Sequence, residues 1–112
     1  MGPVIALACA AASGVSSSAR DEVCQEFLTT LQDLYPGRKF DADARSASVP
    51  RIALTVTYAT ERGLGLEVAW LAGDGRRTDG LPLRTSFYDR PSDAELRRRF
   101  YLYFLQKNPL PF

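Results

Sequence analysis

The sequence predicts an α+β fold: a single domain of order α-β-β-β-α, with two helices packed on one face of an antiparallel sheet. Two observations predict this fold. Apolar residues recur at helical spacing over residues 21–35 and again after residue 92. Between these segments, residues 51–60 and 64–71 alternate between apolar and small or polar positions on either side of a short turn, which is typical of a hairpin. An antiparallel sheet needs cover on one face, so both helices are expected on the same side.

Residues 1–19 differ in composition from the rest of the chain. They carry no charge, whereas every charged side chain lies from Arg20 onward. A short run of small apolar residues followed by serines is typical of a secretory signal peptide, with cleavage expected after Ala19. The basic residues that normally begin such a peptide are absent, so a disordered, flexible or packed N-terminal extension stays open as an alternative. Residues 20–112 form the expected domain, and the expected location is periplasmic or secreted.

One cysteine, Cys9, lies in the uncharged segment 1–19, and the other, Cys24, lies in the expected domain. Cys9 ends the segment Ala6-Leu7-Ala8-Cys9, which resembles the lipid-attachment motif of bacterial lipoproteins, although Ala6 stands where Leu or Val is usual. A lipid anchor on Cys9 is therefore a minor alternative. Cys24 lies on the apolar stripe of the first expected helix, where a free buried cysteine acts as a small hydrophobic residue. If the N-terminus is retained, a Cys9–Cys24 disulfide becomes an option.

The first helix is expected over residues 21–35, with Ser18 or Asp21 as its N-cap and Pro36-Gly37 at its end. Its apolar positions follow the i, i+3, i+4, i+7 pattern: Val23, Cys24, Phe27, Leu28, Leu31, Leu34 and Tyr35. A short edge strand over residues 38–42 is an optional addition to the sheet.

Three strands follow. In the first, at residues 51–60, one face is formed by Ile52, Leu54, Val56 and Tyr58. A turn at residues 61–63 leads to the second strand at residues 64–71, and a polar loop is expected over residues 73–80. The third strand is expected over residues 81–89, where Pro82 places its beginning at a sheet edge or a bulge because proline cannot donate to the ladder.

The last helix is expected to begin at Ser92, which forms a capping box with Glu95, and to end near Lys107. A short Pro-rich tail, residues 109–112, follows. Phe100, Tyr101, Tyr103 and Phe104 cover more of the helix circumference than one sheet can bury. Either the first helix packs alongside, or an arginine- and aromatic-rich surface is left for a partner, since such residues are enriched at binding sites. The expected partner-binding residues are Arg97, Arg98, Tyr101, Leu105 and Phe112.

Composition narrows the classes of function. The chain has no histidine, which excludes Ser-His-Asp and Cys-His catalytic groups and imidazole metal ligands within it. The acidic residues form no recognisable catalytic pair or metal-binding loop, so we expect no catalytic residue, metal or cofactor. A net charge of +1 gives no general attraction to nucleic acid, and the apolar run near the N-terminus is too short for a transmembrane helix.

The leading hypothesis is therefore a small exported protein without catalytic activity, which binds a protein or envelope partner through its C-terminal helix. A second hypothesis is a small enzyme or ligand carrier with a site between the sheet and loop 41–49, bordered by Asp41, Asp43 or Arg51. A third is a cytosolic antitoxin or immunity-like protein, which requires residues 1–19 to stay attached. The sequence gives no oligomeric state.

Overall fold

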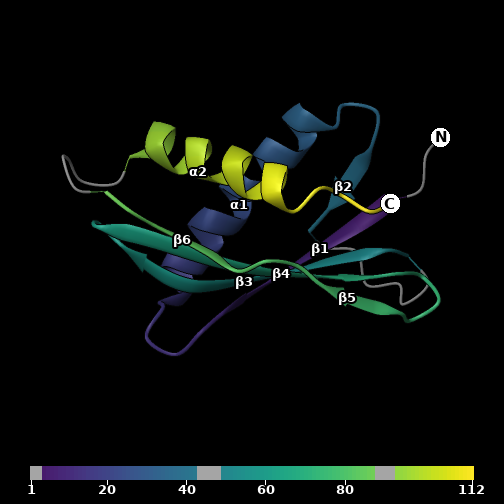
Figure 1. Ribbon diagram of the computed structural model, residues 1–112, viewed down its shortest axis with the longest axis horizontal. Helices are drawn as coiled ribbons and strands as arrows, with labels where there is room; N and C mark the ends of the chain where they lie inside the picture. Colours follow the sequence, from purple (N-terminus) through teal and green to yellow (C-terminus); the bar gives the residue numbers. More distant parts are fainter. Residues whose placement is uncertain (1–3, 43–48, 88–92) are drawn as a thin grey trace.

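The computed structural model describes residues 4–42, 49–87 and 93–112. These residues form an α+β fold of two helices and a six-stranded sheet (Figure 1). The elements follow one another as β1 (Val4–Ala11), α1 (Ser17–Leu34), β2 (Lys39–Asp41), β3 (Arg51–Thr60), β4 (Gly63–Leu71), β5 (Arg77–Asp79), β6 (Leu83–Ser86) and α2 (Ala94–Lys107). The α+β class expected from the sequence is confirmed, with more strands than the three or four expected.

The sheet is mixed, which corrects the expectation of an antiparallel sheet. Its strand order is β2-β1-β3-β4-β5, and β6 also pairs with β4. β1 runs parallel to both of its neighbours, β2 and β3, whereas the pairs involving β4 are antiparallel. The error follows from the N-terminal segment: without a strand there, the remaining strands can be arranged as an antiparallel meander.

Residues 4–11, expected within a leader or a disordered segment, form β1 inside the sheet. Ile5, Ala6 and Leu7 are at most 2% exposed. A strand with parallel neighbours on both sides reads as a continuous apolar run, which is also how the apolar part of a signal peptide reads. The expectation of disorder is therefore wrong for this segment. Cleavage after Ala19 stays a prediction, and it would remove a strand from the middle of the sheet.

The helix α1 begins four residues earlier than expected. Its N-cap is Ser16, whose side chain accepts a hydrogen bond of 3.1 Å from the backbone N–H of Ala19. This bond satisfies one of the free N–H groups of the first turn. The centre of the expected apolar stripe is confirmed, because Val23, Phe27 and Leu31 are buried, whereas Leu34 at its end is 43% exposed.

The hairpin of β3 and β4 is confirmed, with one change of side-chain direction. The register shifts between Val56 and Tyr58, so that Tyr58 pairs with Gly65 instead of following Val56 into the core. A side chain at Gly65 would place its Cβ 2.5 Å from the Thr57 hydroxyl oxygen, so the irregular pairing requires glycine here. The Tyr58 ring instead contacts the guanidinium of Arg84, whose Cζ lies 3.8 Å from the ring centroid.

In the C-terminal half, the strands and the second helix begin and end at other residues than expected. β5 forms inside the segment expected to be a loop, and β6 is shorter than the expected strand. The N-cap of α2 is Asp93, whose Oδ1 accepts a hydrogen bond of 2.9 Å from the N–H of Leu96. This cap corrects the expected box of Ser92 and Glu95; Ser92, like residues 88–89 of the expected strand, lies outside the described residues.

Both helices pack on the same face of the sheet, where they form one core with β1, β3 and β4 (Figure 1). Phe27 of α1 meets two rings of α2, with centroid distances of 5.8 Å to Tyr101 and 6.0 Å to Phe104. We call the opposite side the open face, because no helix or strand in the described ranges packs on it. It is formed by the side chains that alternate with those of the core, among them Ala8, Ala10, Ala53, Thr55, Tyr58, Glu67, Ala69 and Arg84.

Candidate functional site

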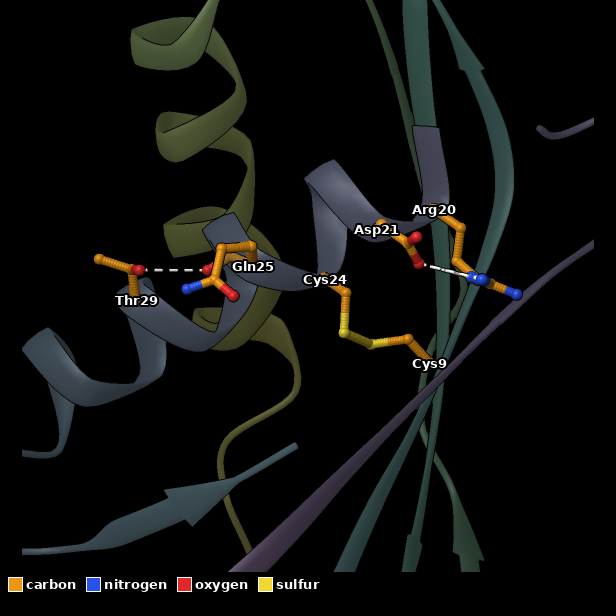
Figure 2. Close-up of a disulfide and its surroundings, with 6 residues drawn as sticks. All are labelled: Cys9, Arg20, Asp21, Cys24, Gln25 and Thr29. Carbon is orange, nitrogen blue, oxygen red and sulfur yellow. Dashed lines mark hydrogen bonds and ion pairs between the residues drawn. A yellow bond between two sulfur atoms is a disulfide. The ribbon is translucent and has the colours of Figure 1, made fainter. Parts of the chain in front are cut away.

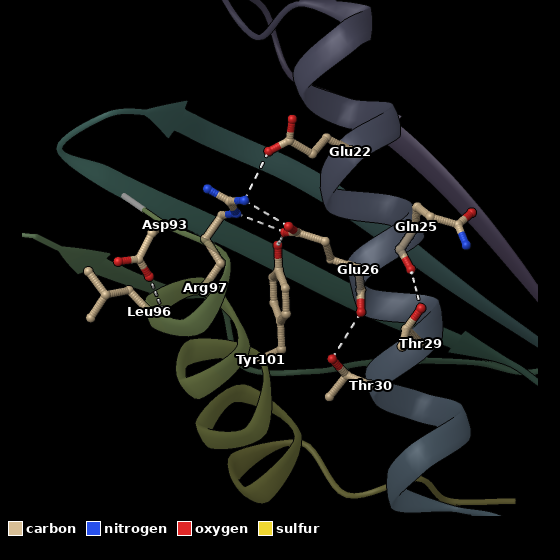
Figure 3. Close-up of polar contacts among 9 residues, drawn as sticks. All are labelled: Glu22, Gln25, Glu26, Thr29, Thr30, Asp93, Leu96, Arg97 and Tyr101. Carbon is tan, nitrogen blue, oxygen red and sulfur yellow. Dashed lines mark hydrogen bonds and ion pairs between the residues drawn. The ribbon is translucent and has the colours of Figure 1, made fainter. Parts of the chain in front are cut away.

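A cluster of charged and hydroxyl groups links α1 to α2, on the face of the sheet that the helices cover. The guanidinium of Arg97 donates two hydrogen bonds of 2.8 Å, from Nε and Nη2, to the two carboxylate oxygens of Glu26 (Figure 3). Its Nη2 also lies 3.1 Å from the carboxylate of Glu22. The Arg97 side chain is 17% exposed, and its hydrogen bonds to Glu26 raise its pKa above the usual arginine value. This arginine is thereby fixed within the molecule.

Tyr101 completes this interhelix cluster. Its hydroxyl donates a hydrogen bond of 2.6 Å to Oε1 of Glu26 (Figure 3). Tyr101 as a whole is 0% exposed. Burial raises the pKa of Tyr101 well above its ordinary value, and the hydrogen bond to Glu26 adds to the increase. The phenol therefore stays a neutral donor to a charged acceptor, a pairing stronger than a hydrogen bond between two neutral groups.

These contacts correct the expected exposure of the partner-binding residues. Tyr101 and Leu105 are buried, at 0% and 6% exposed, because α1 packs alongside α2. The carbonyl of Phe112 accepts a hydrogen bond from Arg38, so the C-terminal tail docks against the body of the molecule. Arg98 is the exposed member of the group, and its Nη2 lies 3.6 Å from a carboxylate oxygen of Asp33. The five residues thus form no common exposed patch.

A disulfide links β1 to α1. Sγ of Cys9 and Sγ of Cys24 are bonded, with 6.1 Å between the two Cα atoms (Figure 2). This bond corrects the expectation of a free, buried Cys24. Because lipid attachment would use the same sulfur of Cys9, the lipid-anchored form and this disulfide exclude each other. The disulfide requires that residues 1–19 stay attached, so it and cleavage after Ala19 also exclude each other.

The hypothesis of a ligand site between the sheet and loop 41–49 depends mostly on residues 43–48, Asp43 among them, which lie outside the described residues. At the described border, an open cavity of about 330 Å³ is lined by Val4, Gln32, Arg38, Lys39, Phe40 and Asp41. In the ranges described, no group of three or more histidine, cysteine or acidic side chains is placed to hold a metal. The described helices include none with the length and apolar content needed to span a bilayer.

The open face is the second candidate surface. Its centre consists of small side chains in register across three strands, where Ala8 lies beside Ala53 and Ala53 beside Ala69. A cavity of about 440 Å³ opens here; its lining includes Ala53, Thr55, Glu67, Ala69, Arg77 and Asp79. Arg77 and Asp79 are paired at 2.9 Å. Glu67 is exposed and makes no hydrogen bond or ion pair with any described residue.

The outward side of α2 is the third candidate surface. We call five of its exposed residues the outer stripe: Arg98, Arg99, Leu102, Tyr103 and Gln106. Leu102 and Tyr103 are 37% and 49% exposed, which makes them two of the four large apolar residues described as exposed. The stripe was missed in the sequence because the expected site was centred on Tyr101, one position away on the helix. Its signal was the helical spacing that places Arg98, Arg99 and Gln106 three or four positions from Leu102 and Tyr103.

Comparisons with known proteins show the fold and no more. No protein-family model matches the chain, and no curated protein matches it. Among solved structures, the chain resembles a dodecamer of a PelC variant from Paraburkholderia phytofirmans, with TM-score 0.75 and 9% identity over 98% of this chain and 88% of that chain. A second PelC dodecamer from the same organism aligns with TM-score 0.75 and 10% identity over 94% of this chain and 85% of that chain. An uncharacterised protein aligns with TM-score 0.63 and 9% identity over 90% and 86%.

Proposed function

We propose that this chain is a non-catalytic assembly module of an oxidising compartment, which associates with further copies of itself. The observation that carries the proposal is the open face: a sheet with helices on one side presents a broad, small-residue surface on the other. Sheets with parallel pairing, such as that of β1 with β2 and β3, are usually covered on both faces. The structurally similar PelC chains are described as dodecamers, which supports self-association as the way this face becomes covered.

The disulfide supports the location. Bonds between cysteines form and persist in the periplasm, the cell exterior and comparable compartments, and they are rare in the cytosol. The two cysteines of the chain are bonded to each other across β1 and α1. The proposal therefore takes export from the disulfide rather than from a leader at residues 1–19, and it disfavours the cytosolic antitoxin hypothesis.

Self-association is tested by sedimentation velocity of the oxidised full chain over a range of concentrations. The wild-type chain is expected to form a defined oligomer. Ala53→Arg, which places a long charged side chain at the centre of the open face, is expected to lower the mass by weakening association at least about tenfold, equivalent to about 1.4 kcal/mol. Gln32→Arg introduces the same residue on the exposed side of α1 and should leave the oligomer intact. A wild-type chain that is monomeric at every concentration contradicts the proposal.

The compartment is tested by the intact mass of the protein isolated from its native host, with alkylation before and after reduction. Both cysteines are expected to react only after reduction. Alkylation of two free thiols without reduction would contradict an oxidising compartment. The same spectrum reports whether the residues of β1 and Cys9 are still attached.

A further inference from the structure

We infer that the copies associate head to tail: the outer stripe of α2 on one copy docks on the open face of the next. This inference rests on the proposed self-association and specifies its surfaces. The two surfaces belong to opposite layers of the fold, since α2 and the open face lie on opposite sides of the sheet (Figure 1). Docking one on the other gives each sheet a helix layer on both faces, which is a common layered arrangement.

The two surfaces are complementary in shape and polarity. The open face offers small side chains, so another element can approach the sheet closely at Ala8, Ala53 and Thr55. The outer stripe offers the large side chains Leu102 and Tyr103, which are exposed in the single copy. Burying these large apolar side chains against such a surface is the main stabilising contribution expected at the contact.

The charges are complementary as well. Arg98 and Arg99 flank Leu102 on the outer stripe, and each is more than half exposed, at 59% and 68%. Glu67 lines the cavity of the open face and has no partner among the described residues. On their own copy Arg98 lies 3.6 Å from Asp33 and Arg99 lies 2.8 Å from Glu95, both in exposed ion pairs that contribute little. An arginine of the stripe that reaches this cavity would therefore exchange such a pair for one with Glu67.

A two-fold contact would place the open face of one copy against the same face of another and would leave the outer stripe of both copies exposed. In a head-to-tail contact the two surfaces cover each other, and repetition of the contact leads to a closed ring or an open filament.

Complementation between two variants tests the arrangement. Leu102→Glu damages the outer stripe and leaves the open face intact, while Ala53→Arg does the reverse. Each variant alone is expected to sediment as a monomer. An equimolar mixture is expected to form a heterodimer, because one intact stripe and one intact open face remain available. Leu34→Glu, at another exposed leucine (43% exposed), is the matched control and should assemble like the wild type.

Each outcome separates this inference from the proposed function. If the wild type forms oligomers but Leu102→Glu does so equally well, the head-to-tail contact is overturned and self-association stands. If each variant is monomeric and the mixture also stays monomeric, the head-to-tail contact is likewise overturned. A monomeric wild type overturns both. Circular dichroism confirms that each variant is folded, and Tyr103→Glu replaces Leu102→Glu if that variant does not fold.

Discussion

At the scale of single residues, one carboxylate joins the two helices. Glu26 of α1 accepts hydrogen bonds from both Arg97 and Tyr101 of α2. The helical periodicity placed Glu26 on the polar side of its helix, so nothing in the sequence pattern distinguished it from its polar neighbours. The pattern of one helix cannot show which part of that side a second helix will cover. The same limitation explains why Tyr101 was expected at a surface and lies in the core.

Tyr101→Phe tests the hydrogen bond to Glu26 while preserving the ring contact with Phe27. We expect the free energy of unfolding to fall by about 1–2 kcal/mol, because a charged acceptor loses a buried donor but keeps Arg97. Urea denaturation monitored by circular dichroism measures the change. The matched control is Tyr103→Phe, whose half-exposed hydroxyl makes no described hydrogen bond and whose removal should cost less than about 0.5 kcal/mol. Equal losses in the two variants would contradict the role of the bond.

The raised pKa of Tyr101 predicts a dependence on alkaline pH. The stabilising effect of a group whose pKa is raised on folding is fully present below its pKa in the unfolded chain, here the ordinary value of 10.0. Above that value the unfolded state loses the proton while the folded state retains it, so stability falls as pH rises further. The advantage of the wild type over Tyr101→Phe should therefore shrink above about pH 10. Urea midpoints measured on both proteins across this range check it, and a constant difference would contradict it.

At the scale of elements, strict alternation and helical periodicity identified the strongest segments. The hairpin and the apolar stripe of α1 were predicted correctly because each is a local pattern with a buried and an exposed side. β1 was missed because its apolar run has no such contrast, which is the expected appearance of a strand flanked by parallel neighbours. β5 was missed because all three of its residues are exposed, leaving no hydrophobic signal. Of the candidate surfaces, the sequence indicated α2, but it centred on Tyr101 and Leu105, which the structure buries.

The disulfide between β1 and α1 should stabilise the fold by about 3 kcal/mol, because it closes a loop with a sequence separation of 15 residues in the unfolded chain. Adding a reductant is expected to lower the urea midpoint of the wild type. The double variant Cys9→Ala, Cys24→Ala should start from the lower midpoint and show no response to reductant. A wild-type midpoint that is the same in both conditions would contradict this contribution.

At the scale of the whole molecule, two helices on one face define both the core and the surfaces left outside it. The fold class and this one-sided cover followed from the sequence, since two amphipathic helices accompany a half-buried sheet. Neither the open face nor its extent could be predicted, because both depend on β1 lying between β2 and β3. When residues 4–11 are interpreted as a leader, β1 is left out of the expected sheet, and its alanines are left out of the open face.

A comparison of two truncated chains tests whether residues 1–19 belong to the fold. The chain 4–112 is expected to melt cooperatively. The chain 20–112 lacks β1 and leaves the edges of β2 and β3 unpaired, with Ile52, Leu54 and Val56 losing their neighbours on one side. We expect it to lack a cooperative thermal transition in circular dichroism. A cooperative transition in the 20–112 chain would contradict the expectation that β1 is needed for the fold and would agree with cleavage after Ala19.

The parallel placement of β1 has a consequence for how the chain folds as it is made. β1 pairs with β3, whose residues are about 45 positions later in the chain, so this pairing must wait until α1 and β2 have been synthesised. Contacts between residues distant in sequence slow folding, and an apolar strand that waits for its partner is exposed to aggregation in the meantime. Nascent chains should therefore depend on chaperone protection until β3 has emerged.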